Sequence, residues 1–268
     1  VLARSVGWIS VYAHSNPNRS GDSMRNGHAR ISPTAHYTGY VWYRNGLSYR
    51  GLMTPQGLLA YHSMSGFDRI HRAIFRTGLE ALLLARHTWI DARVADFLSE
   101  YPNGQVVELA AGLTPRGTRL IQSYPSASWW ETDLPDMVRL KRNKLHRAGL
   151  LSDRLQTAPV DVFATSGTYS LSHLGSKLHK SRPVLMITEG LVNYFPTATI
   201  EGLWLRLSAF LKSFPSGRYL SGVVGEECER LPAVPLFRGG LMLAARGTNA
   251  LHYHDETECR DALLRCGF

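Results

Sequence analysis

Acidic side chains follow two apolar segments of the sequence, at positions where ligands commonly bind. Asp133 ends the segment Ser128–Asp133, 25 positions after Glu108, and Glu189 ends the segment Pro183–Glu189. In an open α/β sheet, ligands bind at the carboxyl ends of the parallel strands. Asp133 is therefore expected to accept hydrogen bonds from both hydroxyls of a ribose, to cap the helix that begins near Pro135, or to do both.

The segment between residues 106 and 112, Val-Val-Glu-Leu-Ala-Ala-Gly, predicts a strand that ends in a turn of small residues. Such a turn allows a ligand to approach the backbone closely. Gly112 stands among alanines, so the glycine pattern of a pyrophosphate loop is missing. This favours a compact adenosyl ligand without a phosphate group.

Glu189 is followed by Gly190-Leu191-Val192. A carboxylate at the end of this strand is expected either to balance the sulfonium and amino groups of such a ligand, or to pair with Arg116 or Arg119.

Arg86 interrupts an apolar helical stripe. Its other members are mostly apolar and lie at positions 79, 82, 83, 90, 94 and 97. A guanidinium on a buried face requires an anionic partner. That partner is either a structural carboxylate or the carboxylate of an amino-acid ligand.

Composition bounds the class of protein. The chain has 268 residues, 44% of them hydrophobic, and is expected to form one core with an N-terminal appendage. No apolar run reaches the eighteen or so residues of a membrane span, and no signal peptide is recognisable, which favours a cytoplasmic protein. The three cysteines, at 228, 259 and 266, follow no disulfide or metal pattern and are interpreted as free thiols.

The formal net charge of +9 is concentrated near the N-terminus. The first fifty residues carry arginines at 4, 19, 25, 30, 44 and 50 against one acid, Asp22. Such an arm is suited either to nucleic acid or an acidic ligand, or to a solvated basic surface. No nucleic-acid-binding motif accompanies the charge.

From residue 105 onward, short apolar runs alternate with helical stretches, which predicts an α/β fold with a mainly parallel sheet flanked by helices. The expected strands are Gln105–Leu109, Ser128–Asp133, Leu155–Asp161, Pro183–Glu189 and Gly217–Val224. The best-defined helices are expected at Asp136–Ala148, Thr197–Phe214 and Asp255–Cys266, and a further strand at Gly267–Phe268. On this pattern the sheet would continue beyond residue 268.

The first part of the chain has a different sequence pattern. Residues 1–66 lack sustained periodicity and are interpreted as a lid of loops and short helices over a domain spanning residues 67–268. Between them, Asp68–Tyr101 has the spacing of one long or broken helix.

These motifs together resemble the leucine carboxyl methyltransferase family of S-adenosylmethionine-dependent enzymes, which includes polyketide O-methyltransferases. The resemblance covers about residues 76–215. The family's first motif is similar to residues 107–120, VELAAGLTPRGTRL, its second to Glu131, Asp133 and Pro135, and a later one to Glu189-Gly190-Leu191-Val192 before Tyr194. The resemblance implies a Rossmann-like class I methyltransferase fold.

The same resemblance implies roles for individual residues. Arg86 would hold the methionine carboxylate of S-adenosylmethionine, and Asp133 its ribose. Glu108, Ala110 and Gly112 would line the cofactor, Asp161 and Val162 would flank adenine, and Glu189 would close the pocket near the methionine end. Two departures concern the loop: Ala110 replaces the first glycine of the motif, and Thr114-Pro115 replaces an Asp-Thr pair.

The predicted function is transfer of a methyl group to a carboxylate or hydroxyl oxygen of a polyketide-like small molecule or of a carboxyl terminus. Two alternatives are an enzyme of tRNA modification and a cofactor-binding regulator without catalysis. No catalytic base can be named. Five aromatic residues are candidates either for lining an acceptor pocket or for structural packing: Tyr37, Tyr40, Trp42, Tyr43 and Tyr194. Of these, Tyr43 and Tyr194 are the predicted substrate contacts. No metal site is expected, because His252 and His254 lack further ligands at a fixed spacing.

Overall fold

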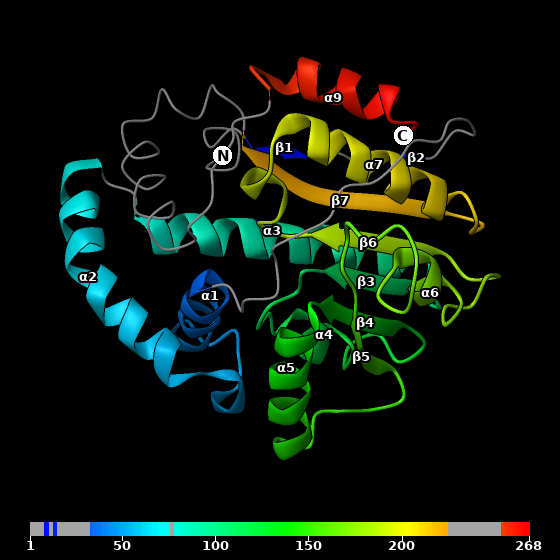
Figure 1. The fold of residues 1–268 in the computed structure, drawn as a ribbon. Helices are drawn as coiled ribbons and strands as arrows, with labels where there is room; N and C mark the ends of the chain where they lie inside the picture. Colours follow the sequence, from blue (N-terminus) through cyan, green and yellow to red (C-terminus); the bar gives the residue numbers. More distant parts are fainter. Residues whose placement is uncertain (1–7, 11–12, 15–32, 76–77, 225–252) are drawn as a thin grey trace.

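A computed structural model of the chain describes residues 8–10, 13–14, 33–75, 78–224 and 253–268. Its centre is a sheet in which five strands run parallel in the order β7-β6-β3-β4-β5 (Figure 1). These strands are β3 (Gln105–Leu109), β4 (Ser128–Asp133), β5 (Leu155–Pro159), β6 (Val184–Thr188) and β7 (Gly217–Val224). The predicted α/β fold with a mainly parallel sheet is therefore confirmed.

Two short strands were not predicted. β1 (Trp8–Ser10) and β2 (Ala13–His14) both pair antiparallel with β7. Part of the segment assigned to a lid thus extends the sheet.

β5 is shorter than predicted. It ends at Pro159 and not at Asp161, and the Asp161 carboxylate accepts the Phe163 N–H in the turn that follows.

The strand order reverses direction between β3 and β6. From β3 the chain moves outward through β4 to β5, and it then returns to build β6 and β7 on the other side of β3. Such a switch point leaves a crevice outside the carboxyl ends of the two central strands, because their connecting helices depart to opposite faces of the sheet. The residues after β3 and β6 flank this crevice.

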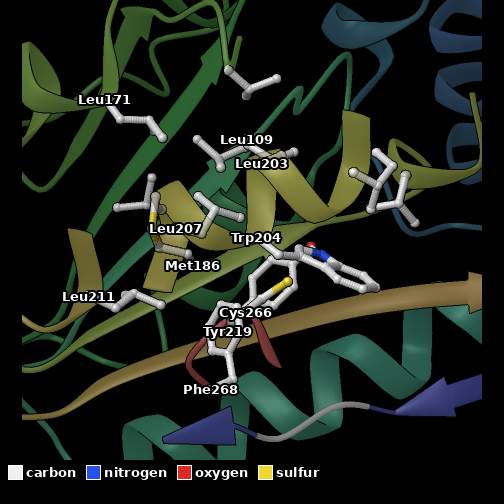
Figure 2. Close-up of a cluster of buried hydrophobic side chains, with 14 of the residues drawn as sticks. Leu109, Leu171, Met186, Leu203, Trp204, Leu207, Leu211, Tyr219, Cys266 and Phe268 are labelled. Carbon is white, nitrogen blue, oxygen red and sulfur yellow. Dashed lines mark hydrogen bonds between the residues drawn. The ribbon is translucent and has the colours of Figure 1, made fainter. Parts of the chain in front are cut away.

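Alternating side chains of the central strands supply two hydrophobic cores. Val107 and Met186 belong to one core, and Val106 and Leu185 to the other. The first core also receives the helices α6 (Leu171–Gly175), α7 (Thr197–Leu211) and α9 (Glu256–Arg265), while the second packs against α3 (Leu79–Glu100). Figure 2 shows the first core, in which Leu203, Trp204, Leu207 and Leu211 of α7 pack against the sheet.

The remaining short helices follow the strands. They are α4 (Arg116–Leu120) after β3, α5 (Pro135–Arg147) after β4 and η3 (Val192–Tyr194) after β6. The predicted helices at 136–148 and 197–214 are confirmed with ends shifted by a few residues.

The N-terminal lid is more regular than its sequence suggested. It contains α1 (Pro33–Arg44), the short η2 (Arg50–Leu52) and α2 (Pro55–Phe75), which has 21 residues. α2 crosses the expected boundary at residues 66 and 67. The helical pattern at 68–101 is a broken helix, with α3 beginning after Gly78, where the Asp68 carboxylate accepts the Leu79 N–H at 2.7 Å.

One lysine ties this lid to the sheet domain. Lys144 of α5 donates to the backbone carbonyls of Gly51, at 3.2 Å, and Met53, at 2.6 Å. One residue later, the Thr54 hydroxyl caps α2 by accepting the Gly57 N–H, and it also bonds to His36 of α1. The corner between α1 and α2 is therefore held against the helix that follows β4.

The last residues also differ from prediction. The helix predicted at Asp255–Cys266 is α9, which Asp255 caps, but Gly267 and Phe268 form no strand. Gly267 takes a left-handed φ of 91°, and the Phe268 ring then stacks on Tyr219 at 5.4 Å. None of the helices in the described part of the chain combines the length and apolar character of a membrane span. A cytoplasmic location remains an expectation from the sequence.

Candidate cofactor site

The loop after β3 keeps the shape of a glycine turn although its first glycine is replaced. Ala110 and Gly112 both have left-handed backbones, with φ values of 52° and 51°. A non-glycine residue in this conformation costs about 1 kcal/mol or more. The structure therefore shows that Ala110 adopts a glycine-like conformation, and the substitution leaves the turn in place.

α1 of the lid lies directly on this loop. A Cβ atom added to Gly39 would lie 2.9 Å from Leu113 Cβ, and one added to Gly112 would lie 3.1 Å from Ala35 Cβ. Both glycines thus permit a close approach between α1 and the loop. α1 therefore packs directly against the loop after β3.

Asp133 lies at the end of β4 and holds the same loop. One carboxylate oxygen accepts the Gly112 N–H and the other the Leu134 N–H, each at 2.7 Å. The first residue before α5 is Leu134, and no side chain caps this helix, so the alternative role of Asp133 as a helix cap is not what the structure shows. Burial raises the pKa of Asp133, against the effect of its two backbone donors.

Arg86 and Glu189 meet at the end of β6. Arg86 Nε donates to Glu189 Oε1 at 3.0 Å, and both side chains are largely buried. The second oxygen of Glu189 contacts His87 Nδ1 at 3.1 Å and Arg116 Nη2 at 2.6 Å. Of the partners that the sequence left open, Arg86 thus has a protein carboxylate, and Glu189 has the predicted alternative partner Arg116.

Arg116 is the centre of this cluster and is fully buried. Its guanidinium binds three carboxylates: Asp91 at 2.6 Å, Glu108 at 3.1 Å and Glu189 at 2.6 Å. Arg119 adds a second ion pair to Asp91. We call the seven residues Arg86, His87, Asp91, Glu108, Arg116, Arg119 and Glu189 the buried charge cluster. It joins α3, β3 and α4 to the residue that follows β6.

The charges of this cluster balance when His87 is neutral and all three acids are ionised, because three arginines then face three carboxylates. Burial and the nearby Arg116 lower the pKa of His87, which favours the neutral form. Its Nδ1 then donates to Glu189, and its Nε2 accepts from Arg119 at 3.4 Å. His87 is a satisfied core histidine, and neither ring nitrogen is available as a catalytic base.

Glu108 lies inside the cluster. Its carboxylate accepts from Arg116 and, at 3.2 Å, from the Trp129 indole N–H. Burial raises its pKa to about 7, although Arg116 opposes the shift. The Glu108 carboxylate is thus paired within the protein, and its predicted contact with the cofactor stays a prediction.

The predicted adenine residues follow β5. The Asp161 carboxylate accepts the Phe163 N–H at 2.9 Å, and Val162 is buried in the core. Beside them, the rings of Phe163 and Phe195 meet edge to face at 4.5 Å. Asp133 ends β4, and Asp161 follows the end of the neighbouring strand β5 by two residues. The ribose and adenine assignments stay predictions.

The five aromatic candidates differ in what they contact. Tyr37 and Tyr40 pack against Tyr61 of α2, with ring centres 6.2 and 5.1 Å away, so they join the two lid helices. Tyr43 lies next to Tyr40 at 6.1 Å, and the Tyr194 hydroxyl bonds to Thr34 of α1 at 3.4 Å. Trp42 faces the sheet domain, where its ring lies 4.7 Å from that of His87.

Sequence reasoning missed the central position of Arg116 and the participation of His87 and Asp91. The available signal was spacing: residues 83, 87, 90, 91 and 94 are all buried and share one face of α3. Two polar residues on an apolar face, near Arg86, indicate a common buried partner. Which charge they meet depends on α4, which is distant in sequence.

Other predictions concern metals and basic charge. Within the described ranges, no cluster of three or more His, Cys, Asp or Glu side chains could hold a metal ion. Cys259 and Cys266 are free and buried, and Cys228 lies outside the described residues, as do Arg4, Arg19, Arg25 and Arg30. Arg44 of the N-terminal basic segment packs over the Tyr61 ring and contacts Glu80 at 3.9 Å.

We expect replacement of Glu189 to change the acid dependence of stability. Arg116, His87 and Arg86 hold the pKa of Glu189 well below its usual range, so its ionised form stabilises the fold above pH 4.5. That contribution is lost as the pH falls through the folded-state pKa. Glu189→Gln should therefore be less stable than wild type at pH 7, and the difference should shrink below pH 4.5.

Urea unfolding at a series of pH values measures this effect. A matched control is Asp96→Asn, because Asp96 is exposed and pairs only at the surface with Arg93. Its small effect should not depend on pH in this way. A difference between Glu189→Gln and wild type that stayed constant from pH 7 to pH 3 would rule out the proposed ionised state of Glu189.

The solved structures that match this chain include two methyltransferases and PigF with SAH, and this chain covers about half the length of each. Human N-acetylserotonin methyltransferase in complex with SAM is 18% identical, with a TM-score of 0.47, over 74% of this chain and 52% of that one. A putative O-methyltransferase from Nostoc punctiforme is 17% identical, with a TM-score of 0.45, over 66% and 49%. PigF with SAH is 16% identical, with a TM-score of 0.44, over 63% and 46%.

No curated protein matches the sequence at a significant level. The family comparison is decisive, because the leucine carboxyl methyltransferase model matches residues 55–207, more than half of the chain. This range includes α3, the turn after β3, Asp133 and Glu189. The chain belongs to the leucine carboxyl methyltransferase family of S-adenosylmethionine-dependent enzymes.

Proposed function

We propose that this protein transfers a methyl group from S-adenosylmethionine to an oxygen atom, either a carboxylate or a hydroxyl, of a small molecule or a carboxyl terminus. The observation that carries the proposal is the left-handed turn from Ala110 to Gly112, whose last N–H is held by Asp133 at 2.7 Å. A side chain at Gly112 would fill the space between the turn and α1. Such a turn suits a cofactor that lies against the backbone.

In this proposal the residues present fit the cofactor along the edge of the sheet. Asp161 and Val162 after β5 would hold adenine, Asp133 after β4 the ribose, and Arg86 near β6 the methionine carboxylate. Glu189 would supply negative charge near the methionine end. The bound cofactor supplies an activated methyl group, and the chain contributes mainly by orienting the acceptor oxygen and covering the site with α1.

The test is direct. Protein purified without added ligand should be analysed for S-adenosylmethionine or S-adenosylhomocysteine by mass spectrometry, and calorimetry should give a dissociation constant for both. Methyl transfer from cofactor labelled on its methyl group to carboxylate and phenol acceptors then identifies the acceptor class. Binding of the cofactor without transfer to any acceptor would favour the regulatory alternative, and transfer to tRNA alone would favour the RNA alternative.

For a carboxylate acceptor, we expect a rate that is nearly constant from about pH 6 to 9. A carboxylate with a pKa of about 4 is ionised over this range, whereas a phenol with a pKa of about 10 gains reactivity as the pH rises. His87 is enclosed and offers no base. A pH-rate profile at saturating cofactor measures this, and a steep rise would exclude a carboxylate acceptor.

A further inference from the structure

The indole N–H of Trp42 has no partner within the described part of the chain, although the residue is only 5% exposed. Native proteins leave few buried donors unpaired, because an unpaired donor retains the cost of leaving water. Both nitrogens of the neighbouring His87 are already engaged with the cluster. The N–H also lies in the indole plane, which is tilted only 36° from the His87 ring, so it is not directed at the face of that ring.

The location of Trp42 indicates which ligand group would meet it. Ala35, Gly39 and Trp42 form one face of α1, and the first two contact the turn after β3. Trp42 packs on His87, which bonds Glu189 at the end of β6. The strand order places β6 on the side of β3 away from β4 and Asp133. Trp42 therefore lies on the side of the turn opposite to the ribose acid.

We propose that the Trp42 indole N–H donates a hydrogen bond to the carboxylate of the cofactor's methionine moiety. This inference rests on the proposed function, which places the adenosine towards Asp133 and Asp161 and the amino-acid part towards β6. A carboxylate is the strongest acceptor that the ligand offers at this end, and it would satisfy the buried donor. The bond also links α1 to the cofactor, so that the lid contributes to binding.

Two ligands test this assignment. S-adenosylhomocysteine carries the carboxylate, and 5′-methylthioadenosine has the same adenosine and sulfur but no carboxylate. Trp42→Phe keeps an aromatic ring against His87 and removes the donor together with part of the ring volume, a packing change that both ligands would sense equally. We expect Trp42→Phe to weaken S-adenosylhomocysteine by about tenfold and to leave 5′-methylthioadenosine unchanged. Trp89→Phe is the matched control, because Trp89 of α3 packs beside Arg93, and it should alter neither affinity.

Calorimetry gives the six affinities of the wild type and the two variants for the two ligands, and thermal unfolding confirms that both variants are folded. NMR spectroscopy of the wild-type protein labelled with ¹⁵N provides a test that needs no stable variant. The Trp42 indole resonance should shift on addition of S-adenosylhomocysteine but not of 5′-methylthioadenosine. Equal weakening of both ligands by Trp42→Phe, no weakening, or an unmoved indole resonance would overturn the assignment alone. Failure of the wild-type protein to bind either ligand would overturn the proposed function as well.

Discussion

Replacement of Arg116 by methionine is expected to destabilise the protein by about 3 to 5 kcal/mol, because it leaves buried charges without their common partner. Arg116 is fully buried and binds Asp91, Glu108 and Glu189 from three different elements. Without it, two arginines would face three acids, and Glu108 would lose its guanidinium partner. Urea unfolding at pH 7 measures the loss.

Arg119→Met provides the comparison for Arg116→Met. Arg119 also pairs with Asp91, but its side chain is 29% exposed and water can replace it. Its loss should therefore cost clearly less. The double variant Arg116→Met with Glu189→Gln should be more stable than the sum of the two single effects predicts, since it removes one stranded charge. Equal losses for Arg116→Met and Arg119→Met would mean that the cluster does not depend on Arg116.

The second large effect is expected at Asp133. Asp133→Ala should weaken the binding of S-adenosylhomocysteine by about 1 to 3 kcal/mol, because it removes the acceptor proposed for the ribose hydroxyls and leaves the Gly112 N–H without its partner. Calorimetry on the folded variant gives the change in affinity.

Asp136→Ala is the control for Asp133→Ala. Asp136 lies in the first turn of α5, three residues later, with a side chain that is 52% exposed and paired at 3.5 Å with Arg139. It shares the helix end with Asp133 but points to solvent, so its loss should leave the affinity nearly unchanged. Unchanged affinity in Asp133→Ala would instead remove the ribose assignment.

The sequence by itself determined the order and type of most elements from residue 79 onward. The short apolar runs at 105–109 and 128–133 form strands, and alternation of these runs with helices allows few arrangements besides a parallel sheet. Asp133 and Glu189 were predictable as site candidates for the same reason: they stand at the carboxyl ends of strands, where the crevice of such a sheet must lie.

The tertiary structure alone decided which partners these residues have. Arg86 required an anion from its place on an apolar stripe, but its pairing with Glu189 joins residues 103 positions apart. The pairing of Arg116 with Asp91 and the packing of α1 on the turn after β3 also join residues from different elements. Local sequence patterns predict whether a side chain is buried and whether it belongs to a helix or a strand. The identity of a neighbour that is distant in sequence depends on how the elements pack across the whole sheet. A buried charge selects its partner only after the elements have been brought together.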